Sequence, residues 1–254
     1  MLLAGKTAVV TGASEGIGFA IASALSDAGV NTVLTGRREH MLVRAIEKLG
    51  SSSSYVVGDI AERGTAERTI RCAVDRHGSV DLLVCNAGIL LPGTVAEQPI
   101  DEVDRLIGVN LQGTIMTVQA AAPVLAAGQD AAVVVITSSI GRKPAPGLGI
   151  YGATKAALHY LVPTWAAELA YLGIRVNAVC AGITMTPGVR IAAERIAGLE
   201  DMAIGTNLIK RMATAEEVAR PVLTLLDGSL SGYVTGSVWD IDGGHLLDQR
   251  GAEA

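Results

Sequence analysis

Tyr151 and Lys155 stand four residues apart in an Ala- and Leu-rich segment, so on a helix their side chains share one face. A free tyrosine has a pKa of about 10, and a nearby ammonium lowers that value because it favours the phenolate. Ser138 lies at the end of the apolar run 132–137, and the Pro- and Gly-rich loop 142–150 can fold its hydroxyl back over Tyr151. A tyrosine and a lysine at this spacing are usually helix surface, but with the serine they predict proton transfer to a substrate oxygen.

A glycine-rich loop near the start of the chain is the second candidate site. Gly12, Gly16 and Gly18 lie between an apolar run and a helical pattern. Gly12 can make a tight turn, Gly16 lets the backbone approach a pyrophosphate, and Gly18 allows a helix to pack closely on a strand. The free N–H groups at the helix start would face the phosphates. An ordinary glycine turn is the alternative, but the flanking strand and helix favour a dinucleotide site.

The hydrophobic pattern predicts the scaffold that must position these residues. Near-continuous apolar, β-branched runs alternate with longer helical patterns, which is typical of parallel strands covered on both faces. We therefore expect an α/β fold with a Rossmann-type, doubly wound parallel sheet of about seven strands. The expected strands are 6–11, 32–35, 55–57, 81–85, 132–137, 175–180 and 237–241, and the expected helices are 16–28, 38–49, 63–77, 100–127, 151–172 and 215–226.

Composition favours one domain over residues 1–254, with no repeat or linker that would divide it. Half of the residues are hydrophobic but only 3% are aromatic, so the core must consist of Ala, Val, Leu and Ile. The net charge of −5 gives no electrostatic case for binding nucleic acid. No apolar run approaches the roughly 20 residues of a membrane span, and no signal peptide is visible. Three scattered cysteines without metal-like pairing predict a reduced, cytoplasmic protein and no metal site.

The spacing Thr-Gly-x-x-x-Gly-x-Gly resembles the signature of the short-chain dehydrogenase/reductase family, and the resemblance extends over nearly the whole chain. The subgroup it suggests is that of the 3-oxoacyl-acyl carrier protein reductases. Several short motifs in the right order carry the resemblance: Asn86-Ala87-Gly88, Asn110 in the run VNLQGT, residues 177–186 with Ala181 where the family has proline, and Asp242-Gly243-Gly244. We place Ala181 in the loop that would cradle a nicotinamide, where it frees the φ angle that proline would fix.

The resemblance implies a role for each candidate residue. Tyr151 would be the general acid/base, Lys155 would lower its pKa and bind the nicotinamide ribose, and Ser138 would polarise the carbonyl. Asn110 would hold a water that relays protons to Lys155. The expected cofactor-binding residues are Gly12, Ser14, Glu15, Gly16, Ile17, Gly18, Arg37, Arg38, Asp59, Ile60, Asn86, Ala87, Gly88, Tyr151, Lys155, Gly182, Thr184 and Thr186.

The residues after the second strand bear on the choice of cofactor. Gly36 stands where an NAD-specific site has an acid for the ribose hydroxyls, and Arg37 can bind a 2′-phosphate through forked hydrogen bonds. Glu15 argues the other way, since many NADP-using relatives carry a basic residue before the second glycine. Arg38 either joins this site or only begins the next helix. We expect NADP(H), with NAD(H) as the alternative.

These features predict an NADP(H)-dependent oxidoreductase that interconverts a ketone and a secondary alcohol. The candidate pocket residues are apolar, which favours a small lipophilic substrate: Leu90, Leu91, Ile140, Leu148, Met185 and Met202. The C-terminal motif of the family usually contributes to assembly, so we expect a homotetramer or homodimer. The alternatives are an NAD-dependent secondary-alcohol dehydrogenase and a non-catalytic nucleotide sensor.

Residues 185–211 interrupt the alternation of strands and helices. Within them, the run 189–203 is amphipathic, with Ile191, Ile196, Leu199 and Met202 expected to face inward. An irregular segment of this length in a compact domain is usually functional. We expect a lid over the substrate.

Overall fold

Across the described residues, seven strands form one sheet in which every pairing is parallel, in the order β3-β2-β1-β4-β5-β6-β7. The computed structural model describes residues 3–128, 130–195 and 198–247, with the backbone alone at Leu199, Glu200, Met202 and Ala203. The predicted Rossmann-type, doubly wound fold is confirmed. The strands are β1 Thr7–Thr11, β2 Asn31–Gly36, β3 Ser53–Val57, β4 Leu82–Cys85, β5 Ala132–Ser138, β6 Arg175–Ala181 and β7 Val238–Ile241.

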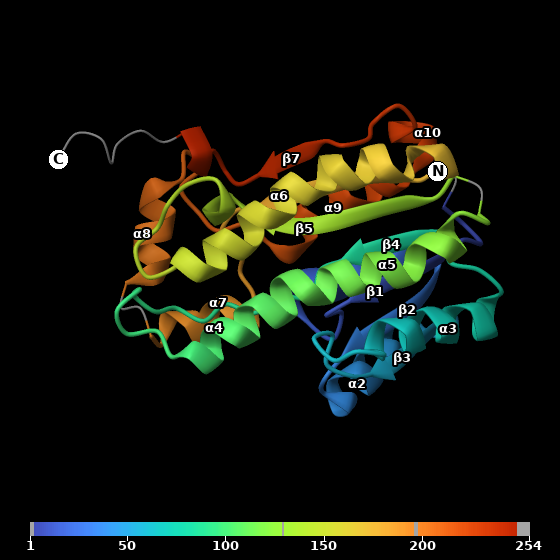
Figure 1. Cartoon of the computed structure of the whole chain (residues 1–254), viewed down its shortest axis with the longest axis horizontal. Helices are drawn as coiled ribbons and strands as arrows, with labels where there is room; N and C mark the ends of the chain where they lie inside the picture. Colours follow the sequence, from blue (N-terminus) through green and yellow to red (C-terminus); the bar gives the residue numbers. More distant parts are fainter. Residues whose placement is uncertain (1–2, 129, 196–197, 248–254) are drawn as a thin grey trace.

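Helices cover both faces of the sheet (Figure 1). Alternate residues of each strand enter one of two apolar cores, one shared with α1, α2 and α9 and the other with α3, α5 and α6. None of the described helices is both long and apolar enough to cross a membrane. The helices are α1 Gly16–Asp27, α2 Glu39–Leu49, α3 Thr65–His77, α4 Ile100–Ile107, α5 Gly113–Leu125, α6 Gly149–Leu169, α7 Pro187–Ala193, α8 Leu199–Thr206, α9 Ala215–Leu226 and α10 Gly228–Ser231.

The single helix expected over residues 100–127 is interrupted. A π-helical turn, Gly108–Gln112, separates α4 from α5. Just after it the chain packs closely on Ile60, as the lack of room for a side chain shows: a Cβ added at Gly113 would lie only 2.8 Å from Cγ2 of Ile60. Such turns occur mostly as single irregularities and often at functional sites. This one contains Asn110.

Ala181 lies in a strand and not in the loop where we expected it. It is the last residue of β6, and it pairs with Ser138 of β5 on one side and Ile241 of β7 on the other. Parallel pairing on both sides fixes its backbone, so the freedom expected from the loss of proline is absent. That expectation was wrong, and the loop begins at Gly182.

The expected lid, residues 185–211, contains two short helices, α7 and α8, and not one amphipathic run. Gly198, with a φ of +70°, precedes α8. Ile191 is 58% exposed, so its expected inward orientation was wrong. Ile196 and the side chains of Leu199 and Met202 lie outside the described part of the chain. A β-bridge between Thr184 and Ala213 joins the two ends of the segment.

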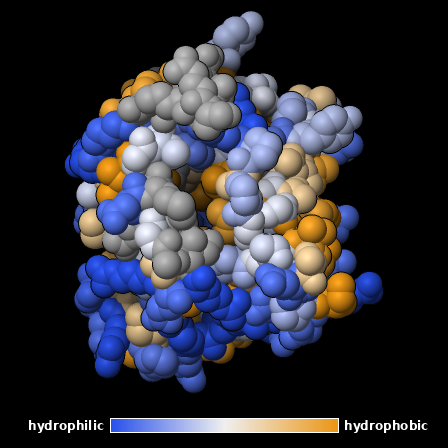
Figure 2. All heavy atoms as spheres, turned by 90° about the vertical axis from the view of Figure 1, so that its left-hand side faces the viewer, coloured by the Kyte–Doolittle hydropathy of each residue, from blue (hydrophilic) through white to orange (hydrophobic). Residues whose placement is uncertain are grey.

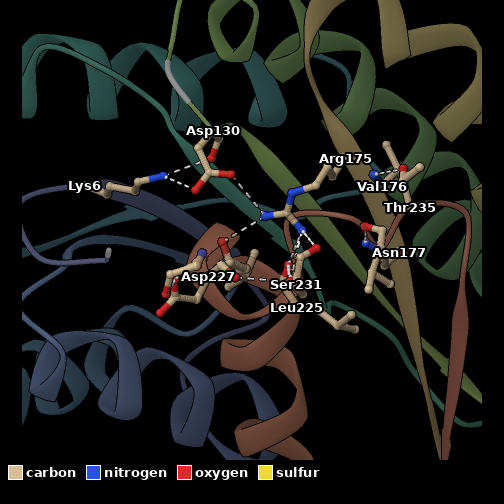
Figure 3. A network of polar contacts seen from close by, with 12 residues as sticks. Lys6, Asp130, Arg175, Val176, Asn177, Leu225, Asp227, Ser231 and Thr235 are labelled. Atoms are coloured by element: carbon tan, nitrogen blue, oxygen red, sulfur yellow. Dashed lines mark hydrogen bonds and ion pairs between the residues drawn. The ribbon is translucent and has the colours of Figure 1, made fainter. Parts of the chain in front are cut away.

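A polar network stabilises the edge of the sheet at which the strands begin (Figure 3). The guanidinium of Arg175, at the start of β6, donates to the carbonyl oxygens of Leu225 and Leu226 at 2.7 and 3.2 Å. It also lies 3.5 Å from the carboxylate of Asp130, which binds the ammonium of Lys6 at 3.1 Å. Carbonyls at a helix end have no partner within the helix, so Arg175 ties the end of α9 to the sheet.

Replacing this arginine should therefore destabilise the fold. Arg175→Ala should lower the free energy of unfolding by about 2–4 kcal/mol, because buried carbonyls and the Asp130 carboxylate lose their donor. Urea unfolding measures the change. Arg76→Ala, on the exposed surface of α3, should cost no more than about 0.5 kcal/mol. Equal losses in the two variants would contradict a stabilising role for the network.

Candidate active site

The carboxyl edge of the sheet brings the four predicted catalytic residues together. Ser138 ends β5, and Tyr151 and Lys155 lie in the first two turns of α6. Ser138 lies close enough to the phenol of Tyr151 to favour its ionised form and so lower its pKa. A Cβ at Gly88 would lie 3.4 Å from Oδ1 of Asn110 and 3.5 Å from Nζ of Lys155, so one backbone position touches both. The arrangement supports the proton-transfer site predicted from the spacing.

Lys155 is a buried base. It is 4% exposed, and its ammonium donates to the carbonyl oxygen of Ile136, 3.0 Å away. Burial lowers the pKa of Lys155 from 10.5 to about 8, because the charged form loses water; nearby Cys85 acts in the opposite direction. The site therefore holds a cation that loses its proton more readily than an ordinary lysine.

Tyr151 differs from its expected state. We expected the ammonium of Lys155 to lower the pKa of Tyr151, but burial of the phenol raises it, and the nearby Ser138 only partly opposes that shift. The ammonium is 5.9 Å from the centre of the tyrosine ring and donates to Ile136 instead. Tyr151 consequently keeps its proton at neutral pH. It is prepared to act as an acid.

Asn110 fastens three segments to one another. Its Oδ1 accepts the N–H of Ile89 at 2.8 Å, and its amide donates to the carbonyl of Ile89 at 3.0 Å and to the hydroxyl of Thr154 at 3.3 Å. Thr154 in turn donates to the carbonyl of Tyr151 at 2.7 Å. The side chain of Asn110 therefore binds protein groups in this structure and positions α6. Sequence reasoning did not identify Thr154, whose only local signal is its place between Tyr151 and Lys155.

The glycine loop is shaped for a ligand that meets backbone. Gly12 has a φ of +63°, and a Cβ there would lie 2.8 Å from Cα of Ala87. A Cβ at Gly18 would collide with the amide nitrogen of Asn86. No side chain at these positions could fit, and α1 begins at Gly16 with its first N–H groups open to an anion. The residues present therefore fit the pyrophosphate of a dinucleotide.

Thr11, at the end of β1, holds this loop in place and was missed by sequence reasoning. Its hydroxyl accepts the N–H groups of Asn86 and Ala87, each at 3.0 Å. The amide of Asn86 returns hydrogen bonds to the carbonyls of Thr11 and Gly12, at 2.9 and 3.0 Å. The motif after β4 thus supports the glycine loop directly. The sequence indicated this role of Thr11 only through its place at the start of the glycine motif.

Two ion pairs lie where an adenosine would sit. Arg38 pairs with Glu15 at 2.5 Å, and Arg37 lies 3.7 Å from the carboxylate of Asp59. Both arginines are about half exposed, so each can turn towards a ligand. A Cβ added at Gly36 would lie 3.7 Å from Oγ of Ser14, so the end of β2 lies beside the glycine loop. Four charges of alternating sign therefore line this end of the site.

Two expected cofactor residues contribute through the apolar core. Ile60 is 6% exposed and packs under Gly113, and Ile17, in the first turn of α1, is half-buried against the core. Only their backbone groups remain suited to a polar ligand. Their side chains hold the loops in place.

The segment after β6 connects the glycine loop with the catalytic residues. Thr186 caps α7 by accepting the N–H of Val189 at 3.3 Å, and its methyl group would meet a Cβ at Gly16 at 3.4 Å. Thr184 is 3% exposed and donates to the carbonyl of Gly182 at 3.0 Å. These residues can line a ligand that extends from the pyrophosphate site towards Tyr151.

An apolar pocket of about 480 Å³ lies beside the loop between β5 and α6. Of the expected substrate residues, Ile140 and Leu148 line it, and Leu90, Leu91 and Met185 are not part of its lining. Met202 has a side chain outside the described part of the chain. Because Ser138 and Tyr151 do not line the pocket either, it is a neighbour of the catalytic centre. Among the described residues, no group of three His, Cys, Asp or Glu side chains could hold a metal ion.

Comparisons with known proteins find similar sequences and a similar fold. A family model described as "Enoyl-(Acyl carrier protein) reductase" matches residues 12–245. Oxidoreductase asL5 of Sarocladium schorii is 36% identical over 95% of this chain and 96% of its own, and dehydrogenase/reductase SDR family member 4 of Bos taurus is 33% identical over 95% and 87%. The 3-ketoacyl-(acyl-carrier-protein) reductase of Brucella melitensis, solved with NADH, superposes with a TM-score of 0.89 at 27% identity, over 96% and 99% of the two chains.

The buried lysine makes a prediction about stability and pH. Its pKa is about 8 when folded and 10.5 when free, so between these values the unfolded chain binds more protons and stability rises with pH. Below about pH 8 the buried charge carries its full cost. Lys155→Met should therefore be more stable than the wild type at pH 7, by about 1–2 kcal/mol after the loss of one hydrogen bond.

Urea unfolding of both proteins at pH 7 and pH 10 measures this difference. The advantage of the methionine variant should shrink at pH 10. If the variant is less stable at pH 7, or if the difference is the same at both pH values, Lys155 is not a destabilising buried cation.

Proposed function

Because the chain belongs to the short-chain dehydrogenase/reductase family, we propose that it is an NADP(H)-dependent oxidoreductase that interconverts a lipophilic ketone and a secondary alcohol. The observation that carries this proposal is that the end of β5 and the start of α6 bring the hydroxyl of Ser138, a protonated Tyr151 and the buried Lys155 together. These groups lie at the same sheet edge as a glycine loop that fits a pyrophosphate. A site for proton transfer next to a dinucleotide site is what reversible carbonyl reduction requires.

The chain's own residues would perform the proton transfer. A bound nicotinamide supplies or accepts hydride at its C4 atom. In the reducing direction, Ser138 donates a hydrogen bond to the substrate carbonyl and Tyr151 transfers its phenolic proton to the same oxygen. The ammonium of Lys155, 5.9 Å from the centre of the ring, would then act on the phenolate through its charge, because a positive charge favours the ionised form. In the oxidising direction, the same phenolate accepts the proton of the alcohol.

The choice of NADP(H) rests on Arg37, Arg38 and the absence of an acid at Gly36. The guanidinium groups are exposed enough to bind a 2′-phosphate in forked geometry. Glu15 and Asp59 compete for them in the protein alone. A 2′-phosphate would have to displace at least one of these carboxylates, so the preference should be sensitive to both.

A lipophilic substrate is supported by the surface around the site. Figure 2 looks onto the carboxyl edge and shows hydrophobic residues in and around a hollow, whereas the lower part of this face is hydrophilic. Exposed apolar side chains from α4, α7 and the ends of the 185–211 segment lie at this edge: Ile100, Ile107, Met185, Ile191, Leu208 and Ile209. A sugar bound at this edge would place its hydroxyl groups against these apolar side chains.

We also propose that α7 and α8 act as the lid over this substrate. Thr186, at the start of α7, contacts the glycine loop, and Arg195, just after α7, pairs with Glu102 of α4 at 2.9 and 3.1 Å. The segment therefore spans the site from one wall to the other.

The chemistry is tested by Tyr151→Phe, which keeps the ring and removes the transferable proton. With NADPH and a panel of aliphatic and aryl ketones, kcat should fall by about 10²–10⁴, the usual contribution of general acid catalysis. NADPH binding, followed by its fluorescence, should persist. Tyr160→Phe is the matched control, since Tyr160 lies exposed on the same helix and should be dispensable.

Two outcomes would reject the proposal. A Tyr151→Phe variant that keeps most of its turnover would rule out the tyrosine mechanism. If the wild type binds NADPH but turns over no ketone, alcohol or 3-oxoacyl thioester, the nucleotide-sensor alternative holds. An enoyl thioester belongs in the panel, because reduction of its double bond alone would assign a different reaction.

The cofactor preference is tested by two substitutions at the adenosine end. Arg37→Ala should weaken NADPH relative to NADH by about 1.5–3 kcal/mol, the value of a hydrogen bond to a charged group. Glu15→Gln should strengthen NADPH by about 0.5–1 kcal/mol, because Arg38 is released from an exposed ion pair. Titration with both cofactors measures each effect, and Arg44→Ala, exposed on the nearby helix α2, is the control.

A wild-type preference for NADH, or equal losses for both cofactors in Arg37→Ala, would overturn the assignment and favour the NAD-dependent alternative.

A further inference from the structure

The turn after β7 places His245 against the residue that follows the catalytic serine. Nδ1 of His245 lies 2.9 Å from the hydroxyl oxygen of Ser139, which is 2% exposed. The carbonyl of Ser139 accepts the backbone N–H groups of Arg142 and Lys143, each at 3.0 Å. A side chain from the C-terminal turn thus contacts the point where β5 passes into the catalytic loop.

The turn that carries His245 is rigidly built. The carboxylate of Asp242 is mostly buried and accepts the N–H groups of Gly244 and Leu246, each at 2.9 Å. Gly243 and Gly244 have φ angles of +63° and +81°, which other residues rarely adopt. A Cβ at Gly182 would lie 2.6 Å from Cα of Asp242, so the turn is packed against the end of β6. His245 is therefore held in a fixed position.

Two further contacts join the same two segments. Arg142 pairs with Asp240 at 2.5 Å, and the ammonium of Lys143 donates to the carbonyl of His245 at 3.0 Å. The register of the sheet sets this meeting, since Ser138 pairs with Ala181 and Ala181 pairs with Ile241. Residues 139–143 are consequently clamped onto residues 240–245.

We propose that His245 is a positioning residue for the catalytic serine, acting through the hydroxyl of Ser139. The inference rests on the proposed function, in which Ser138 binds the substrate oxygen. Oγ of Ser138 accepts the N–H of Ile140 at 3.3 Å, so the direction of the catalytic hydroxyl depends on the turn that Ser139 begins. A displacement of about 1 Å at a reacting group can reduce the rate by about a hundredfold.

The experiment compares His245→Ala, His245→Asn, Ser139→Ala and the double alanine variant. His245→Ala should lower kcat by about 10–100-fold and leave the KM for NADPH unchanged. Asparagine should restore most of the rate, because its amide places a polar atom near the position of Nδ1. The double variant should be no slower than the slower single variant, since both changes remove the same contact between His245 and Ser139. His77→Ala, at the far end of α3, is the control.

Hydrogen exchange at the amides of Arg142 and Lys143 supplies a readout that needs no turnover. Both should exchange faster in His245→Ala and in Ser139→Ala, and at the wild-type rate in His245→Asn. If the wild type reduces no ketone, the proposed function fails, but the exchange rates still decide whether the clamp exists. If His245→Ala does not fold, Ser139→Ala carries the same test with the turn intact.

Wild-type kcat in His245→Ala, losses that add in the double variant, or unchanged amide exchange would each overturn the proposal.

Discussion

The parallel pairing of every strand is the constraint on which the site depends. Because all the strands run in one direction, their carboxyl ends meet at one edge, and the chain leaves β1 and β4 towards opposite sides of the sheet. Register makes this specific: Ser138, Ala181 and Ile241 lie at one level across three strands. The glycine loop, the segment after β4, Ser138 and the C-terminal turn therefore lie along one edge of the sheet, although the chain separates them by up to more than 200 residues.

Burial then decides the protonation states within this edge. Removal from water raises the pKa of Tyr151 and lowers that of Lys155, so the acid retains its proton while the base becomes weaker. The opposing shifts separate the roles of the two groups before any ligand arrives. Holding the Lys155 cation away from water, on the carbonyl oxygen of Ile136, costs stability.

The sequence was sufficient for features that depend on local pattern. Apolar runs predicted each strand to within two residues at either end, and Ser138, Tyr151 and Lys155 could be chosen because strand end and helix spacing are local properties. Features that depend on distant contacts were missed or wrong. The π-turn lies just before the point where Gly113 packs closely on Ile60, the strand position of Ala181 needs partners on both sides, and the pKa of Tyr151 follows from burial. His245 and Ser139 are 106 residues apart, so no sequence spacing indicates their contact.

If a nicotinamide delivers hydride beside this proton-transfer site, an isotope on its C4 atom must appear in the product. NADPH carrying deuterium at both C4 positions is incubated with the best ketone of the panel, and the alcohol is examined by mass spectrometry and NMR. We expect one deuterium per molecule, bonded to the carbinol carbon, while the hydroxyl proton comes from solvent through Tyr151. An alcohol without deuterium at that carbon, or with the label at another carbon, would contradict hydride transfer at this site.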